Sequence, residues 1–108
     1  MNYIWITTQF EGFHKYPDAP EEVAFLRNRH RHIFHVKVWI EIFHNERDIE
    51  FILFKQKIDT LIKNKDLNDY SCETIADYIH SKLSVIYRNR KIKIEVNEDN
   101  ENGCEKEY

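Results

Sequence analysis

The segment 30–43 constrains the fold more than any other part of the chain, because its side chains alternate with a period of two. Successive side chains of a β-strand point to opposite faces of a sheet, so this period indicates a strand with one buried face. The residues that share the apolar face are Phe34, Val36, Val38, Ile40 and Ile42. The residues that share the polar face include Arg31, His35, Lys37 and Glu41. The segment therefore predicts a long, half-buried strand.

The flanking segments predict the rest of an α+β domain. Apolar residues fall at helical spacing after a turn at 45–48, and Ser71 is a favourable N-cap for a further helix. The expected elements, in chain order, are a strand at 3–10, a loop at 11–28, the strand at 30–43, a helix at 51–65, a helix that follows Ser71, a strand at 91–96, and a short last strand after a hairpin turn at 102–103. This order favours an antiparallel ββααββ sheet with both helices on one face.

Composition and charge exclude several classes of protein. The chain has 108 residues, which fits a single domain spanning 1–108. An aromatic share of 14% is typical of a folded domain, and a net charge of −3 with scattered basic residues argues against nucleic-acid binding. No apolar run approaches the ~20 residues of a membrane span, and the N-terminus lacks a signal-peptide pattern. Two cysteines do not make a disulfide scaffold, so we expect a cytoplasmic protein with no membrane partner.

The histidines at the start of the long strand indicate a metal site. His30 and His32 are two residues apart, so their side chains point to the same face, whereas His35 points to the other. His14, just past the first expected strand, is a candidate for a third ligand, and three protein ligands with one open position are typical of catalytic zinc. Imidazole also suits iron and nickel. The alternative interpretation is a polar strand end at the rim of a sheet.

Six segments carry a resemblance to a known family. They are 10–14 (Phe-Glu-Gly-Phe-His), 30–32 (His-Arg-His), 50–51 (Glu-Phe), 67–68 (Leu-Asn), 71–76 (Ser-Cys-Glu-Thr-Ile-Ala) and 96–103 (Val-Asn-Glu-Asp-Asn-Glu-Asn-Gly). In their order and spacing they resemble motifs of the 6-pyruvoyl and 6-carboxy tetrahydropterin synthases. The resemblance implies the tunnelling fold, in which ββααββ units assemble into an oligomeric barrel, commonly as trimers stacked into hexamers with substrate sites between subunits.

The resemblance also implies roles for individual residues. His14, His30 and His32 would hold zinc, and Glu98 would bind the amino-pyrimidinone edge of a pterin. A carboxylate suits that edge because it accepts two parallel N–H bonds, although a surface glutamate in an acidic tail is the alternative for Glu98. The segment 71–73 would also contact the ligand, with Ser71, Cys72 and Glu73 as the candidates. Glu73 is equally suited to stabilising the helix N-terminus, and Cys72 to packing beneath it.

The chain departs from the family pattern at the catalytic positions. The segment 23–29 before His-Arg-His contains no cysteine, and the family's Asp-His pair falls on Lys63 and Asn64. Asparagine does not exchange protons near neutral pH, and general acid–base groups typically contribute about 10²–10⁴-fold to a rate. The candidates left for catalysis are Cys72 at the start of a helix, Lys63, and Glu22 in the loop before the long strand.

Two functions from different classes are consistent with this pattern. The first is a zinc-dependent enzyme, a tetrahydropterin synthase-like lyase, that acts on a reduced pterin or a related purine derivative. The second is a non-catalytic protein that binds or sequesters a guanine-type nucleotide or another purine ligand. A subunit whose fold serves only assembly is a third possibility. The retained histidines favour the first function, and the missing acid–base residues favour the second.

Overall fold

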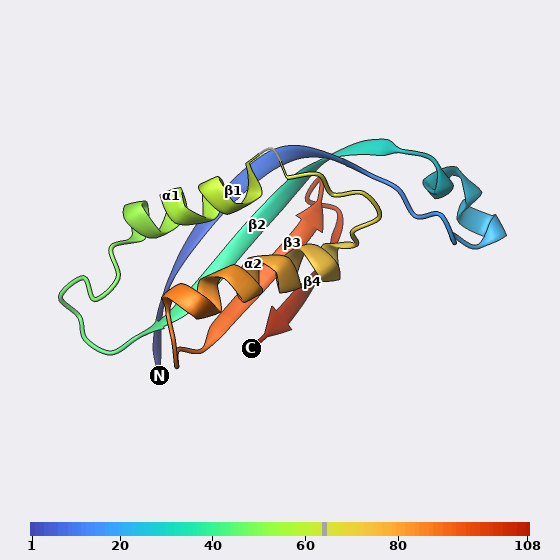
Figure 1. Ribbon diagram of the computed structural model, residues 1–108. Coiled ribbons are helices and arrows are strands. Elements are labelled where there is room, and N and C mark those ends of the chain that lie inside the picture. The colour runs from blue at the N-terminus through green and yellow to red at the C-terminus, as the bar shows by residue number, and fades with distance from the viewer. Residues whose placement is uncertain (64) are drawn as a thin grey trace.

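The computed structural model describes residues 1–63 and 65–108, and its frame is a four-stranded antiparallel sheet in the order β1-β2-β3-β4 (Figure 1). The strands are β1 (Asn2–His14), β2 (His30–Ile42), β3 (Ile92–Glu98) and β4 (Asn102–Glu107). β1 and β2 pair along their whole length, so that His14 lies directly opposite His30. Because β3 pairs only with residues 34–40 of β2, the ends of β1 and β2 continue beyond the sheet as a curved arm, residues 11–33 (Figure 1).

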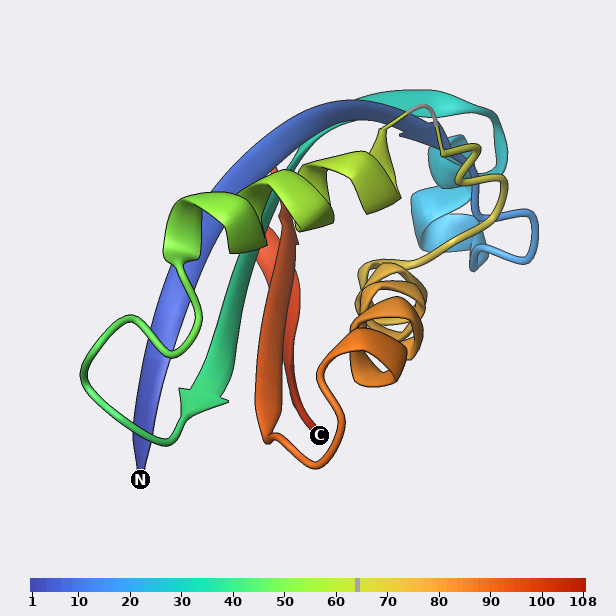
Figure 2. The same ribbon diagram turned by 60° about the vertical axis from the view of Figure 1, so that its left-hand side comes forward.

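Two α-helices cover one face of this sheet. The helices are α1 (Phe51–Ile62), α2 (Cys72–Ile86) and a short 3₁₀ helix, η1 (Glu21–Arg27). α1 packs on β1, α2 packs on β3 and β4, and η1 lies at the tip of the arm (Figure 2). This arrangement confirms the predicted α+β class and the placement of both α-helices on one face. Within the described residues, none of the helices has both the length and the apolar character needed to cross a membrane.

The core lies between the helices and the apolar face of β2 that the sequence predicts. Phe34, Val38 and Ile40 have no exposed surface, and burying a large apolar side chain contributes about 1.5–3 kcal/mol relative to leaving it exposed. The helix residues buried against this face are Phe54, Ile58, Ile62, Ile75, Ala76, Ile79 and Leu83. The opposite face of the sheet is open to solvent. Trp5, which lies on this face, is 54% exposed. Burial on a single face keeps the strands in the observed register, because a slip by one residue would expose the core.

The boundaries of the helices confirm one prediction and correct another. The Ser71 hydroxyl accepts a hydrogen bond from the Thr74 N–H at 3.1 Å, so Ser71 is the N-cap of α2 as expected. α1 begins at Phe51 as expected, but it ends at Ile62 rather than at residue 65, since Lys63 has extended backbone angles. Residues 63–66 carry no apolar side chain that would extend the buried stripe of α1.

β1 is longer than the predicted strand at 3–10, and it takes in His14, which the sequence places just past it. Gly12 permits this extension, because a Cβ atom there would lie 2.7 Å from the Leu67 Cδ1 and 2.8 Å from the Phe34 ring. A strand with any larger residue at this point would be pushed away from the core. The predicted loop at 11–28 is therefore replaced by strand at its start and by η1 near its end.

The last hairpin turns earlier than the sequence predicts. Asp99 and Asn100 have φ angles of 57° and 60°, a left-handed conformation that Asp and Asn tolerate better than most residues. The turn therefore lies at 99–101 instead of 102–103, and β3 runs to Glu98 instead of residue 96. Gly103 lies within β4, where a side chain would collide with the backbone of Val96. This earlier turn brings Glu98 and Asp99 towards the arm formed by residues 11–33.

Candidate metal centre

Pairing between β1 and β2 brings the three predicted metal ligands together. His14 ends β1 opposite His30, and His32 lies two residues further along β2 on the same face. That face is the core face, so the three rings pack as a continuation of the core beside Phe34. The centroid of the His14 ring is 4.6 Å from that of the His30 ring and 5.3 Å from that of the His32 ring. His14 is buried and the other two rings are half-buried.

Each of the three rings is held by a hydrogen bond at its Nδ1 atom. His14 Nδ1 lies 2.6 Å from the Tyr70 carbonyl oxygen, and His30 Nδ1 lies 2.8 Å from the carbonyl oxygen of Asn28. His32 Nδ1 lies 2.7 Å from Asp99 Oδ2. A carbonyl or carboxylate oxygen only accepts hydrogen bonds, so Nδ1 is the protonated nitrogen in all three rings. Nε2 of each ring is therefore the nitrogen left to bind a metal.

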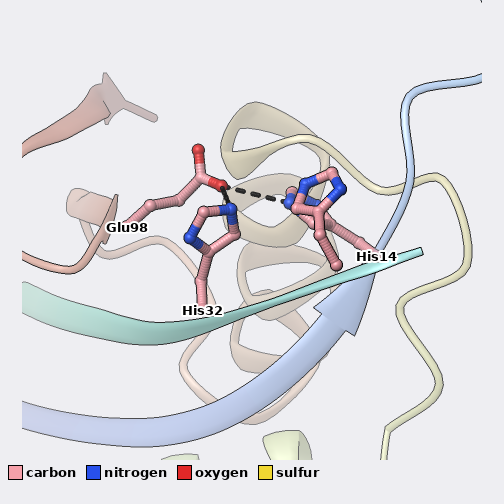
Figure 3. A group of neighbouring side chains, drawn as sticks. His14, His32 and Glu98 are labelled. Carbon is pink, nitrogen blue, oxygen red and sulfur yellow. Dashed lines mark hydrogen bonds and ion pairs between the residues drawn. The ribbon is translucent and has the colours of Figure 1, made fainter. Parts of the chain in front are cut away.

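The Nε2 atoms of His14 and His32 both lie close to the carboxylate of Glu98. Glu98 Oε2 lies 2.8 Å from His32 Nε2 and 3.1 Å from His14 Nε2 (Figure 3). One ligand atom from each of His14, His30, His32 and Glu98 lies within 4.8 Å of all the others. Three ring nitrogens and one carboxylate oxygen therefore face a common centre. A divalent cation at this centre would be bound by imidazole nitrogens and a carboxylate oxygen, a donor set that fits such a metal.

Asp99 is a functional candidate that the sequence analysis missed. Its carboxylate accepts from the His32 ring through Oδ2 and from the Ile33 N–H through Oδ1 at 2.8 Å. The hydrogen bond from His32 is the largest cause that lowers the pKa of Asp99, followed by the one from Ile33. A carboxylate that orients a metal-binding histidine is a common arrangement in metal sites. The signal in the sequence was an acidic residue next to Glu98, but its distance from His32 follows only from the observed turn.

A cavity of about 540 Å³ adjoins the histidines. His14, His30 and Glu98 form one part of its lining, and the start of α2 forms another. The predicted ligand-binding residues that line this cavity are Ser71, Cys72, Glu73 and Glu98. The structure thus brings together all four residues that the sequence predicts for ligand binding, next to the three predicted for metal.

The residues at the start of α2 differ in what they offer to a ligand. Ser71 is exposed, but its hydroxyl is engaged as the N-cap. Glu73 is exposed in the first turn of α2, where the positive end of the helix dipole stabilises its charge. Cys72 is buried, and burial is the main cause that raises the pKa of its thiol to about 12, with the charge of Glu98 adding to the effect. A thiol with this pKa stays neutral at pH 7.

The other candidates for catalysis lie away from the cavity. Lys63 is exposed at the C-cap of α1, and Glu22 is exposed in η1. Neither belongs to the lining of the cavity. Asn64, on which part of the family's Asp-His pair falls, lies outside the described residues. Among the described candidates, only Cys72 borders the cavity, and it does so as a neutral thiol.

Comparison of the sequence with models of known protein families and with curated proteins finds no match. The resemblance to the tetrahydropterin synthases therefore rests on the residues and spacings of this chain.

Proposed function

We propose that this protein binds a divalent metal ion, zinc in the first instance, through His14, His30 and His32. The single observation that carries the proposal is that one ligand atom from each of His14, His30, His32 and Glu98 lies within 4.8 Å of all the others. Because each ring is already oriented by its Nδ1 bond, little side-chain freedom is lost when Nε2 binds a metal. When bound, zinc would supply a Lewis acid next to the cavity.

The ligand that we propose for the cavity is a pterin or a purine nucleotide. The walls of the cavity carry the carboxylates of Glu73 and Glu98. A carboxylate accepts two parallel N–H bonds from an amino-pyrimidinone edge. A volume of about 540 Å³ falls within the range of small-molecule sites, roughly 300–1,000 Å³. The family resemblance supports the same ligand class, because Glu98 stands where those synthases bind the pterin.

Two observations favour a binding or sequestering role over the synthase-like lyase reaction. The thiol of Cys72 is neutral at pH 7, which removes the thiolate that would act as a base or nucleophile. Lys63 and Glu22 lie outside the cavity lining, so neither is placed to move a proton to a ligand there. The lyase remains the second candidate function, and the histidine set is the observation that supports it.

The proposed assembly is a homo-oligomer built on the tunnelling fold, a trimer or hexamer with the site between subunits. The edge strands β1 and β4 support it, because each has one side that no strand in the described part of the chain covers. Light scattering coupled to size-exclusion chromatography tests it. A mass of three or six times 13.2 kDa agrees with the proposal, and a monomer contradicts it.

The metal proposal is tested by elemental analysis of the purified protein and two variants. We expect about one zinc per chain in the wild type, and its loss in the His30→Ala/His32→Ala double variant. His35→Ala is the matched control, because His35 lies on the same strand but points to the opposite face. Retention of zinc in the double variant, or a wild type that folds without metal, would contradict the proposal.

The ligand proposal needs a separate experiment. Mass spectrometry of the denatured protein identifies any co-purifying pterin or nucleotide, and incubation with dihydroneopterin triphosphate tests turnover. A bound purine or pterin without turnover supports the binding role. Turnover that requires zinc identifies the lyase instead, and a protein that binds neither pterins nor purine nucleotides contradicts both.

A further inference from the structure

The carboxylate of Glu98 already lies where a fourth metal ligand would be. Bonds of 2.0–2.1 Å place neighbouring ligand atoms of a tetrahedral zinc site roughly 3.3 Å apart. Glu98 Oε2 lies 2.8 Å from one Nε2 atom and 3.1 Å from another, so shifts of a few tenths of an ångström give that separation. The sequence analysis places Glu98 against the organic ligand, whereas the structure places it against His14 and His32.

We propose that Glu98 is the fourth ligand of the metal in the free protein, and that it must leave the metal before a molecule in the cavity can bind there. The inference rests on the proposed metal site and concerns how the binding of a further ligand to that metal is regulated. Glu98 then has two alternating positions, one that closes the metal site and one that receives the N–H groups of the cavity ligand.

The contacts of Glu98 fit a movable ligand. Among the described residues, His14 and His32 are the only partners of its carboxylate, and its side chain is 27% exposed. Asp99 differs, because both of its oxygens are engaged, one by a backbone N–H and one by His32. Within the described part of the chain, the two rings are therefore the polar partners that hold the Glu98 carboxylate, and a bound metal would add to them, while Asp99 keeps His32 oriented when Glu98 moves.

Glu98 also borders the cavity from which a molecule would reach the metal. Glu98, His14 and His30 all line the cavity, so a molecule that reaches these histidines from the cavity lies next to the Glu98 carboxylate. A competitor can bind only to the molecules whose metal site is open. Its apparent affinity is therefore the affinity for an open site multiplied by the fraction of sites that are open. If Glu98 is bound in about nine-tenths of the molecules, its removal strengthens the binding of a small anion about tenfold.

Cobalt(II) and azide test this directly, because the visible spectrum of cobalt reports the number and type of its ligands. Cobalt is loaded into the wild type and into Glu98→Gln, Glu98→Asp and Asp69→Asn, and each is titrated with azide. Glu98→Asp keeps the negative charge but shortens the side chain by one methylene group, which draws the carboxylate away from the histidines. Asp69→Asn removes a charge from the same cavity without touching a histidine.

We expect azide to bind about tenfold more tightly to both Glu98 variants than to the wild type, with Asp69→Asn unchanged. Equal azide affinity in the wild type and both Glu98 variants overturns the role of Glu98 while leaving the metal site intact. A change in Glu98→Gln that Glu98→Asp does not share shows an effect of charge alone, which also overturns it. A wild type that takes up no cobalt overturns the proposed function as well.

Discussion

The substitution Asp99→Asn isolates the contribution of one hydrogen bond to metal binding. Asp99 offers one oxygen to the His32 Nδ1–H and the other to the Ile33 N–H. Asparagine has nearly the same size and tolerates the left-handed φ of 57°, but it has a single acceptor oxygen. Its NH₂ group would face one of the two N–H donors, so the variant loses either the orientation of His32 or the anchoring of the turn.

The expected effect is a weaker metal site in a protein that still folds. Removing the partner of a metal-binding histidine typically lowers metal affinity about 10–100-fold. That range corresponds to about 1.4–2.7 kcal/mol of binding free energy. Competition with a chromophoric zinc chelator measures the affinity, and circular dichroism shows whether the fold is retained.

Glu101→Gln is the matched control, because it removes one negative charge from the same turn without a contact to a histidine. We expect its zinc affinity to stay within about twofold of the wild type, since an exposed charge contributes little. An Asp99→Asn variant with the same zinc affinity as Glu101→Gln would refute the role assigned to Asp99.

Three further predictions follow from contacts elsewhere in the fold. Gly12→Ala places a Cβ atom 2.7 Å from Leu67 Cδ1, and we expect a loss of about 1–3 kcal/mol in the free energy of unfolding measured with urea. The guanidinium of Arg90 is the main cause that lowers the pKa of Asp48 to about 2, so this pair stabilises the fold above pH 4 and the stabilisation is lost as the pH falls towards 2. Asp48→Asn should therefore flatten the loss of stability over that acid range, and an unchanged pH profile would contradict the assignment. Native Cys72 should resist iodoacetamide at pH 8 until urea unfolds the chain, because burial raises the pKa of its thiol to about 12. Mass spectrometry locates the labelled cysteine, and rapid labelling of Cys72 in the folded protein would show a reactive thiol instead.

Local patterns were sufficient to predict the elements that bury one face. The period of two in β2 and the Ser71 N-cap are signals within a few residues, and both are confirmed. The predicted ends of β1 and α1 were wrong. The end of β1 depends on a contact between distant segments, whereas α1 ends where its apolar stripe stops. Gly12 reads as a loop residue in the sequence, yet it is the residue that lets β1 pass close to Leu67.

The same difference between local patterns and contacts of distant segments applies to the candidate site. His30 and His32 share a face by strand geometry alone, and the predicted grouping with His14 depends on the register in which β1 pairs with β2. The contact of Glu98 with the histidines depends on a turn at 99–101, whereas the Asn-Gly signal indicated a turn three residues later. A sequence shows which residues are suited to a metal, but the distances between them follow from pairing and turn geometry.

X-ray absorption at the zinc edge of the purified protein is the most direct test of the metal site. We expect a shell of nitrogen and oxygen ligands at about 2.0–2.1 Å, with the outer scattering of imidazole rings from His14, His30 and His32. A sulfur shell at about 2.3 Å would assign the metal to cysteine instead of the histidines, and would contradict the proposed centre.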